Sequence, residues 1–287
     1  AKGILAKIYL AWAGQGFGEI VGGVFTPTPD KTKFAKAAQQ TLDIINSGQH
    51  SLNQSIELIG QGGEFDKPFP QVFRNYHEGV VDLKESMFEI QFSRQSASFQ
   101  GGNIGSWYGF RIETAKDRPA SSRSIPLPTF WESFQTDDLR KDWSIADIKI
   151  DKIGNFVSIG NFTSKQLGIG KFRRYLAEPT KVTHQTEINW PVLRYADVLL
   201  MFAESVNETL IYGDDLPEGA DMVEAVRVFN LVRERAYGAD VNNSFTPITA
   251  VSGTDFQDDI RQERSWELCF EGVRRHDLVR WGLLIER

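Results

Sequence analysis

The 287-residue sequence lacks the features that identify several large classes of protein. It contains one cysteine, Cys269, so the chain cannot form a disulfide within itself. This does not identify a compartment, because exported bacterial proteins often carry few cysteines. No run of about 18 apolar residues is present, and the sequence therefore predicts no membrane-spanning helix.

Positive charge is scarce relative to negative charge. The chain has 32 lysines and arginines against 38 acidic residues, which gives a net charge of −6 at pH 7. The two signs are mixed along the sequence. A protein that binds nucleic acid normally shows a clustered basic surplus. We therefore expect no nucleic-acid partner.

The motifs of common catalytic and cofactor sites are also missing. No GxSxG elbow, Walker sequence, HExxH helix or CxxC pair occurs. The glycine cluster at 14–18 follows a predicted helix, whereas a dinucleotide-binding loop follows a strand. The four histidines lie far apart, without metal-ligand spacing: His50, His77, His184 and His276. We expect neither a cofactor nor a metal ion.

Adjacent acidic residues occur at Asp137-Asp138, Asp214-Asp215 and Asp258-Asp259. Neighbouring side chains diverge by about 100° on a helix and point to opposite faces of a strand. They therefore do not converge as the two carboxylates of a glycosidase must. We interpret them as turn and helix-cap residues.

Hydrophobic periodicity predicts helices in the first and last thirds of the chain. Residues 1–13 and about 30–47 form one predicted pair, joined by a glycine-rich turn and loop from residue 14. Residues 191–210, apolar on nearly every side, and 222–236 form a second pair. Such helical hairpins are the unit of tetratricopeptide-like arrays.

The middle third has weaker signals. Residues 49–75 are expected to be irregular, and alternation at 86–93 predicts a strand. A long loop follows to about residue 128, then a short helix within 129–143 and a hairpin within 147–160. The predicted fold is mainly α, with tetratricopeptide-like helical hairpins, long irregular loops and a few short strands.

The segment RQERSWELCFEGVRRHDLVRWG, residues 261–282, is predicted to be one helix. Its apolar residues share one arc and form a predicted core stripe: Trp266, Cys269, Phe270, Val273 and Trp281. Gly272, on another face, is expected to let a second helix approach closely.

Charges in the same segment alternate in sign at helical spacing. The predicted ion pairs are Arg264–Glu267, Glu271–Arg274, Glu271–Arg275 and Asp277–Arg280. A catalytic site would need an acid and a base that converge on a cleft, whereas here each charge has a local partner. We interpret the charges as partly buried structural pairs.

One aromatic segment fits neither a helix nor a strand. The stretch 96–113 places Phe99, Trp107, Tyr108 and Phe110 among glycines, which are expected to keep the loop flexible. Such loops are typical of recognition surfaces, and an aromatic face suits the slightly positive C–H groups of a sugar ring. The alternative is that Trp107 and Phe110 tuck under the loop as a small core.

The candidate ligand-binding residues come from this segment. Trp107 and Tyr108 are adjacent aromatics between two glycines and are predicted to stack on a ligand, with Phe99 nearby. Asn103 and Arg111 are the nearest hydrogen-bond donors for hydroxyl groups. No residue is assigned a catalytic role.

Several segments together resemble one family. The ending at 261–282, the helix at 191–208 and FNLVRERA at 229–236 resemble recurrent motifs of the SusD/RagB family, nutrient-binding outer-membrane lipoproteins of Bacteroidota. KESMFEIQFS at 84–93 resembles the family's central strand, and residues 1–12 resemble an earlier tetratricopeptide-like helix. The matching segments occur in the family's order over essentially the whole chain.

The resemblance implies a single SusD-like domain over residues 1–287, incomplete at its N-terminal region and extreme C-terminus. It implies a protein without enzymatic activity that binds oligosaccharide and delivers it to a SusC-like TonB-dependent transporter. The implied location is the surface of the outer membrane, through an N-terminal lipid anchor outside this chain. Peptide capture on the same fold is one alternative. A glycoside hydrolase on a helical scaffold is another, and it would need convergent carboxylates.

Overall fold

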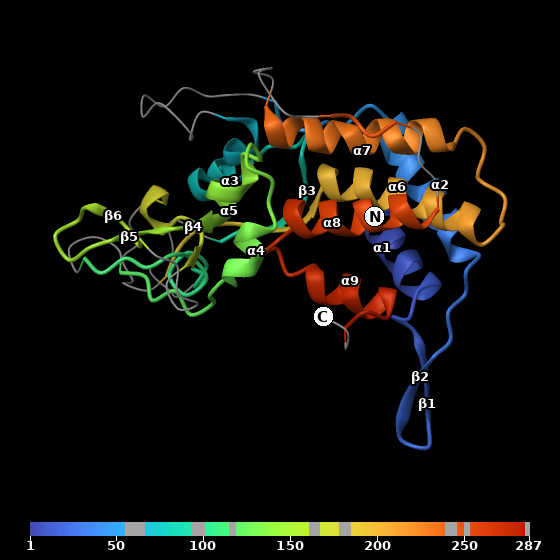
Figure 1. The fold of residues 1–287 in the computed structure, drawn as a ribbon, viewed down its shortest axis with the longest axis horizontal. Helices are drawn as coiled ribbons and strands as arrows, with labels where there is room; N and C mark the ends of the chain where they lie inside the picture. The colour runs from blue at the N-terminus through green and yellow to red at the C-terminus, as the bar shows by residue number, and fades with distance from the viewer. Residues whose placement is uncertain are drawn as a thin grey trace. The chain divides into compact units, whose positions relative to one another are not determined.

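The computed structural model describes residues 1–54, 67–92, 101–114, 119–160, 167–177, 185–238, 246–249 and 253–284 (Figure 1). The chain divides into two compact units. The first comprises residues 1–52, 193–234 and 245–287, and the second comprises residues 53–192 and 235–244. The single domain expected over residues 1–287 stays a prediction.

Helices dominate the first unit. They are α1 (Lys2–Ala13), α2 (Lys33–Asn46), α6 (Tyr195–Ile211), most of α7 (Met222–Tyr237), α8 (Thr254–Glu267) and α9 (Arg274–Trp281). α1 packs against α2 and α9, and α6 packs against α2 and α8. These helices confirm the four predicted from periodicity, although α6 begins at Tyr195 because the strand β8 (Trp190–Arg194) precedes it.

The interior of this unit is built around α6. Every residue from Tyr195 to Thr209 is buried, as its nearly uniform apolar composition predicted. Three acids of α6, Asp197, Glu204 and Glu208, are therefore buried as well. A buried carboxylate is costly unless it is paired, so α6 requires cationic partners from its neighbours.

Between α1 and α2 the structure has a hairpin where the sequence predicted a turn and a loop. β1 (Gly18–Val21) and β2 (Val24–Pro27) pair antiparallel across Gly22 and Gly23. Both glycines have positive φ, 61° and 83°, which the tight two-residue hairpin turn requires. The glycines that indicated a loop in fact close a hairpin.

The single helix predicted over 261–282 is wrong. α8 ends at Glu267 and α9 begins at Arg274, and between them Phe270 and Gly272 have positive φ, 62° and 78°. The break changes the helical phase, so the predicted core stripe does not form, and Trp266, Phe270 and Trp281 are only half-buried. Gly272 is exposed at this break, which corrects its predicted role in close helix packing.

Charged side chains of α6, α8 and α9, rather than apolar ones, meet in the interior of the first unit. The Arg264 guanidinium lies 2.9 Å from Asp197 Oδ1 and 2.9 Å from Asp277 Oδ2. Arg280 pairs with Glu204 and, at 2.8 Å, with Asp277. These five side chains are each 2–7% exposed. We call them the buried ion network.

A second buried arginine links α6 to the end of α8. Arg194 pairs with Glu267 Oε1 at 2.9 Å and with Glu271 Oε2 at 2.8 Å. The predicted Asp277–Arg280 pair is confirmed. The predicted Arg264–Glu267 pair is wrong, because Arg264 turns to the acids of α6 and α9 while Glu267 holds Arg194.

The second unit mixes short helices and strands. Its elements are α3 (Pro68–Glu78), β3 (Ser86–Ile90), α4 (Pro128–Glu132), α5 (Arg140–Ser144), β4 (Ile145–Ala146), β5 (Ile148–Ile150), β6 (Phe156–Ser158), β7 (Gly168–Ile169), the 3-10 helix η2 (Arg174–Leu176) and the first residues of β8. The strands form two-stranded sheets: β3 with β8, β4 with β7 and β5 with β6. The predicted strand, short helix and hairpin are confirmed, and so is the mainly α fold with a few short strands.

α3 contradicts the irregular structure expected at 49–75. Pro68 and Pro70 indicated a loop, but they occupy the first turn of the helix. The amide groups of a first turn have no intrahelical acceptor, so proline is tolerated there.

The adjacent acids are only partly turn and cap residues. The Asp138 carboxylate accepts the Arg140 backbone N–H at 2.9 Å, in the turn just before α5. Asp214 and Asp215 follow α6 in the connection to α7. Asp258-Asp259 lies inside α8, which corrects the interpretation for that pair.

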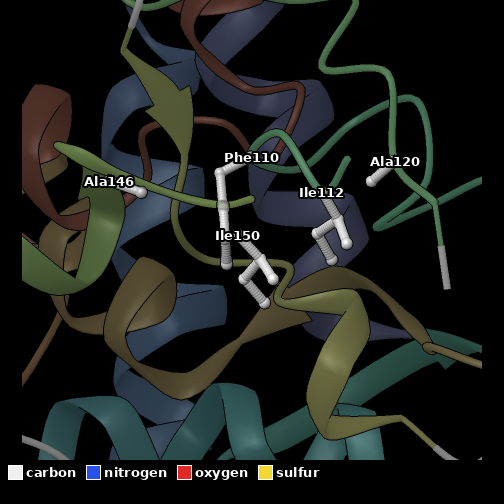
Figure 2. Packing of buried hydrophobic residues seen from close by; sticks show 5 residues of the cluster. All are labelled: Phe110, Ile112, Ala120, Ala146 and Ile150. Carbon is white, nitrogen blue, oxygen red and sulfur yellow. The ribbon is translucent and has the colours of Figure 1, made fainter. Parts of the chain in front are cut away.

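A small apolar core holds the part of the second unit that contains the candidate site. Figure 2 shows Phe110, Ile112 and Ile150 side by side, with Ala120 and Ala146 flanking them. Ile112 pairs through its backbone with both Ala120 and Ile150. This core fixes the end of one loop, at Phe110, and the start of a second, at Ala120.

His77 is a fully buried histidine on α3. Its Nε2 accepts the Arg173 backbone N–H at 2.6 Å, so its Nδ1–H donates to the Phe73 carbonyl. Burial, to which the charges of Arg173 and Arg74 add, lowers the pKa of His77 to about 3. The ring is therefore neutral in the folded protein.

Stability is expected to fall as the pH decreases below about 6.5. Unfolding lets His77 regain its usual pKa of about 6.5, so its depressed pKa stabilises the fold above that pH and the stability is lost towards pH 3. The loss should reach about 2 kcal/mol by pH 5, before most carboxylates titrate. Denaturant unfolding at pH 8, 6.5 and 5 measures it. His77→Gln should flatten this slope and His276→Gln, at an exposed site, should not; an unchanged slope in His77→Gln would refute the assignment.

Candidate functional site

The first loop of the candidate site spans residues 101–110, and backbone hydrogen bonds hold it in one shape. Gly102 exchanges N–H···O bonds with Thr186, at 2.9 and 2.7 Å. The Trp107 amide donates to the Asn103 carbonyl at 2.9 Å, which closes a tight turn. Gly105, inside this turn, has a φ of +80°.

The glycines of this loop permit close packing rather than flexibility. A Cβ on Gly109 would lie 2.5 Å from the Gly105 carbonyl oxygen and 2.6 Å from that of Phe172. A side chain on Gly109 would therefore force the loop away from the segment behind it. The flexible recognition loop expected from the sequence is a packed one.

A second segment lies alongside the first. The amides of Ser121 and Arg123 donate to the carbonyls of Ser106 and Trp107, both at 2.8 Å. Between them Ser122 has a φ of +46°, a left-handed conformation that is unfavourable by about 1–2 kcal/mol for a residue with a side chain. Strained residues of this kind gather at functional sites. Here the strained turn presents Arg123 on the same side as Trp107.

A hollow forms where the two segments meet. It has a volume of about 260 Å³, and its described lining residues are Ser106, Trp107, Pro119, Ala120, Ser121 and Arg123. The Arg123 guanidinium carbon lies 3.9 Å from the centre of the Trp107 ring. Trp107 remains 38% exposed. The volume is slightly below the about 300 Å³ at which ligand pockets begin, so the hollow suits one small chemical unit.

The predicted aromatic residues divide between the hollow and the interior. Trp107 lines the hollow. Tyr108 is half-buried and its ring lies 5.8 Å from that of Phe172 and 5.7 Å from that of Trp190. Phe110 is 1% exposed, so for this residue the interpretation as a small core is correct. Phe99 lies outside the described residues.

The predicted polar residues lie near the hollow but are not among its described lining. Asn103 is half-buried, and its carbonyl accepts hydrogen bonds from the Trp107 amide and the Ser106 hydroxyl. Arg111 is exposed, and its Nε is 2.9 Å from Glu113 Oε1.

Sequence reasoning missed Arg123, Ser106 and Ser121. Arg123 and Ser121 lie in a stretch without aromatic residues or a recognisable motif, and only the backbone pairing brings them to Trp107. Nothing in the local sequence distinguishes them. Their role depends on tertiary structure.

Metal-binding clusters and membrane-spanning helices are both absent from the residues that the structure describes. No group of three or more histidine, cysteine or acidic side chains in this part could hold a metal ion. None of the helices placed by the structure has the length and apolar character to cross a lipid bilayer.

Known proteins resemble this chain in both sequence and fold. The model of the SusD family matches residues 150–286. A solved SusD homologue from Bacteroides thetaiotaomicron VPI-5482 superposes with a TM-score of 0.79 at 28% identity, over 99% of this chain and 53% of that one. The chain thus resembles the SusD family in sequence over residues 150–286 and in fold over nearly its whole length. The resemblance noted in the sequence and the predicted SusD-like fold are confirmed.

Two further relatives are more distant. SusD-like protein P2 of Formosa agariphila is 26% identical over 250 residues, which are 82% of this chain and 47% of that protein. Surface glycan-binding protein A from Bacteroides thetaiotaomicron, solved with laminarihexaose, has a TM-score of 0.56 at 17% identity over 88% of this chain and 51% of that one. The latter likeness shows the fold alone. This chain spans about half the length of these relatives.

Proposed function

We propose that residues 1–287 belong to one SusD-like domain of a cell-surface protein that binds oligosaccharide. The protein would deliver the sugar to a SusC-like TonB-dependent transporter and would be held at the outer membrane by an N-terminal lipid anchor outside these residues. The observation that carries the proposal is the hollow beside the exposed Trp107 in a chain that resembles this family. A surface glycan-binding protein of the same fold was solved with laminarihexaose, which accords with such a role.

The chemistry of the hollow suits a sugar. An exposed indole offers apolar area and a negative ring face to the C–H groups of a pyranose. The hydroxyls of Ser106 and Ser121 and the guanidinium of Arg123 can form hydrogen bonds with sugar hydroxyls. Tyr108, Asn103, Arg111 and Phe99 remain proposed ligand residues of the surrounding surface.

Binding without catalysis is the activity that this lining supports. Hydrolysis of a glycosidic bond normally uses two carboxylates placed about 5–10 Å apart across the bond. None of the six described lining residues is acidic. Their donors and aromatic surface can hold a ligand but do not supply an acid and a base.

A panel of soluble oligosaccharides and protein digests tests the proposal. We expect saturable binding of at least one class of hexasaccharide by isothermal titration, no binding of peptides, and no release of reducing ends. Binding of digests without binding of any glycan would instead support peptide capture. Steady release of reducing ends by the purified protein would identify a hydrolase.

A further inference from the structure

We propose that Arg123 makes the hollow selective for an anionic sugar, one that carries a carboxylate or a sulfate group. This inference rests on the proposed function, because it specifies the ligand of the same site. Three features carry it. Among the described residues the Arg123 guanidinium has no carboxylate partner, it is preorganised over the Trp107 ring, and the described lining of the hollow has no negative charge.

The first feature is that the Arg123 guanidinium has no carboxylate partner among the residues that the structure describes. Three other arginines with exposed or partly exposed side chains do hold one: Arg111 with Glu113, Arg227 with Glu224 and Arg261 with Asp258. Within the residues that the structure describes, the contact of the Arg123 guanidinium is the Trp107 ring, 3.9 Å away. The ring attracts the cation through its negative face. The N–H donors of the guanidinium therefore stay available for a ligand.

The second feature is preorganisation of this cation. A guanidinium has five N–H donors in a rigid plane that matches a carboxylate or a sulfate, and it accepts no hydrogen bond. The strained Ser122 and the bond from the Arg123 amide to the Trp107 carbonyl, 2.8 Å, fix the backbone that carries it. The Trp107 ring restricts the side chain as well. Less rotational freedom is then lost when an anion binds.

The described lining of the hollow carries a positive charge although the chain as a whole is acidic. The net charge of −6 repels an anion at long range, so a preference for one has to arise locally. Arg123 is the charged residue of the described lining, and this lining has no acid. The hollow's volume of about 260 Å³ suits a single charged sugar residue.

A glycan array that carries neutral, uronate-containing and sulfated oligosaccharides tests the inference with the full chain. The strongest binder and its uncharged counterpart of the same linkage are then titrated against the parent, Arg123→Gln and Lys152→Gln. Lys152 is exposed in the turn between β5 and β6, so its replacement makes the same change in net charge away from the hollow. Comparing the uronate-containing with the sulfated oligosaccharides shows whether the site prefers a carboxylate or a sulfate group.

We expect the strongest binder to be anionic and about tenfold tighter than its uncharged counterpart, with binding weakened by salt. Arg123→Gln should abolish this preference and leave the melting temperature unchanged, whereas Lys152→Gln should keep the preference. Equal binding of neutral and anionic forms, or an intact preference in Arg123→Gln, would overturn the inference while leaving the proposed function in place. Failure of every glycan to bind would overturn the proposed function itself.

Discussion

Replacing Arg264 by methionine is expected to destabilise the protein by about 3–5 kcal/mol, because it removes the buried cation that lies between the buried carboxylates of Asp197 and Asp277. Arg264 is 2% exposed and lies 2.9 Å from both Asp197 and Asp277. Methionine fills much of the volume but supplies no charge. Denaturant unfolding followed by circular dichroism measures the change in the free energy of unfolding.

A matched control uses an arginine–carboxylate pair at the surface. Arg227 pairs with Glu224 at 2.6 Å, but its side chain is 52% exposed. Such pairs contribute at most about 1 kcal/mol, so Arg227→Met should change stability little. Equal losses in the two variants would show that burial is not what makes Arg264 important.

The loss of stability caused by Arg264→Met should also depend on pH and become smaller as the pH falls. Burial alone would raise the pKa of both carboxyls. In the parent, however, Lys7 and Arg264 lower the pKa of Asp197, and Arg264 and Arg280 lower that of Asp277, below the usual range. These depressed pKa values stabilise the parent above about pH 4 and lose their effect as the pH falls. In the variant Asp197 keeps Lys7 and Asp277 keeps Arg280, but each has lost a neighbouring cation and therefore takes up a proton more readily. The difference between variant and parent should therefore shrink from pH 7 towards pH 4.

Trp107→Ala is expected to weaken oligosaccharide binding about thirtyfold, the effect of losing about 2 kcal/mol at an aromatic anchor. The substitution removes the indole surface and also releases Arg123, which lies over the ring. Trp107→Phe keeps an aromatic platform and should recover part of the affinity. Stability should change little, because the side chain is 38% exposed. Isothermal titration and thermal melting measure the two effects separately.

Phe110→Ala is the control for this variant, since Phe110 lies in the same loop. It is 1% exposed and packs in the core with Ile112 and Ile150. Its truncation should cost about 3–5 kcal/mol in stability. If Trp107→Ala destabilises the protein as Phe110→Ala does and leaves affinity intact, then Trp107 is a packing residue and the ligand site lies elsewhere.

The helices were predictable from sequence because their signals are local. Apolar spacing at 30–47 and the apolar composition of 191–210 are sufficient for α2 and α6. The break at Phe270 and Gly272 was not predicted, since charge and apolar spacing on both sides are compatible with one continuous helix. Because the break was not predicted, the apolar side chains were expected in the interior, where the structure has charged ones. The partners of Arg264 come from α6 and α9 rather than from α8 itself.

Only part of the candidate site was predictable from the sequence, because the rest depends on contacts between separate segments. Trp107 stands out in the sequence as a large aromatic residue among glycines. Arg123 does not, because it reaches the ring only through backbone pairing between two segments separated along the chain. Composition suggested flexible glycines, whereas Gly109 has no room for a side chain. Contacts of this kind depend on the tertiary fold, which local patterns do not encode.

The most direct test of the proposed site is fluorine NMR of the chain labelled with 5-fluorotryptophan, titrated with the tightest glycan of the array. The protein contains seven tryptophans, and Trp107→Phe identifies the resonance of Trp107 by its disappearance. We predict that the Trp107 resonance shifts as the sugar saturates the protein, while the resonance of the buried Trp143 stays in place. Saturable binding that leaves the Trp107 resonance unmoved and shifts another tryptophan would contradict the account.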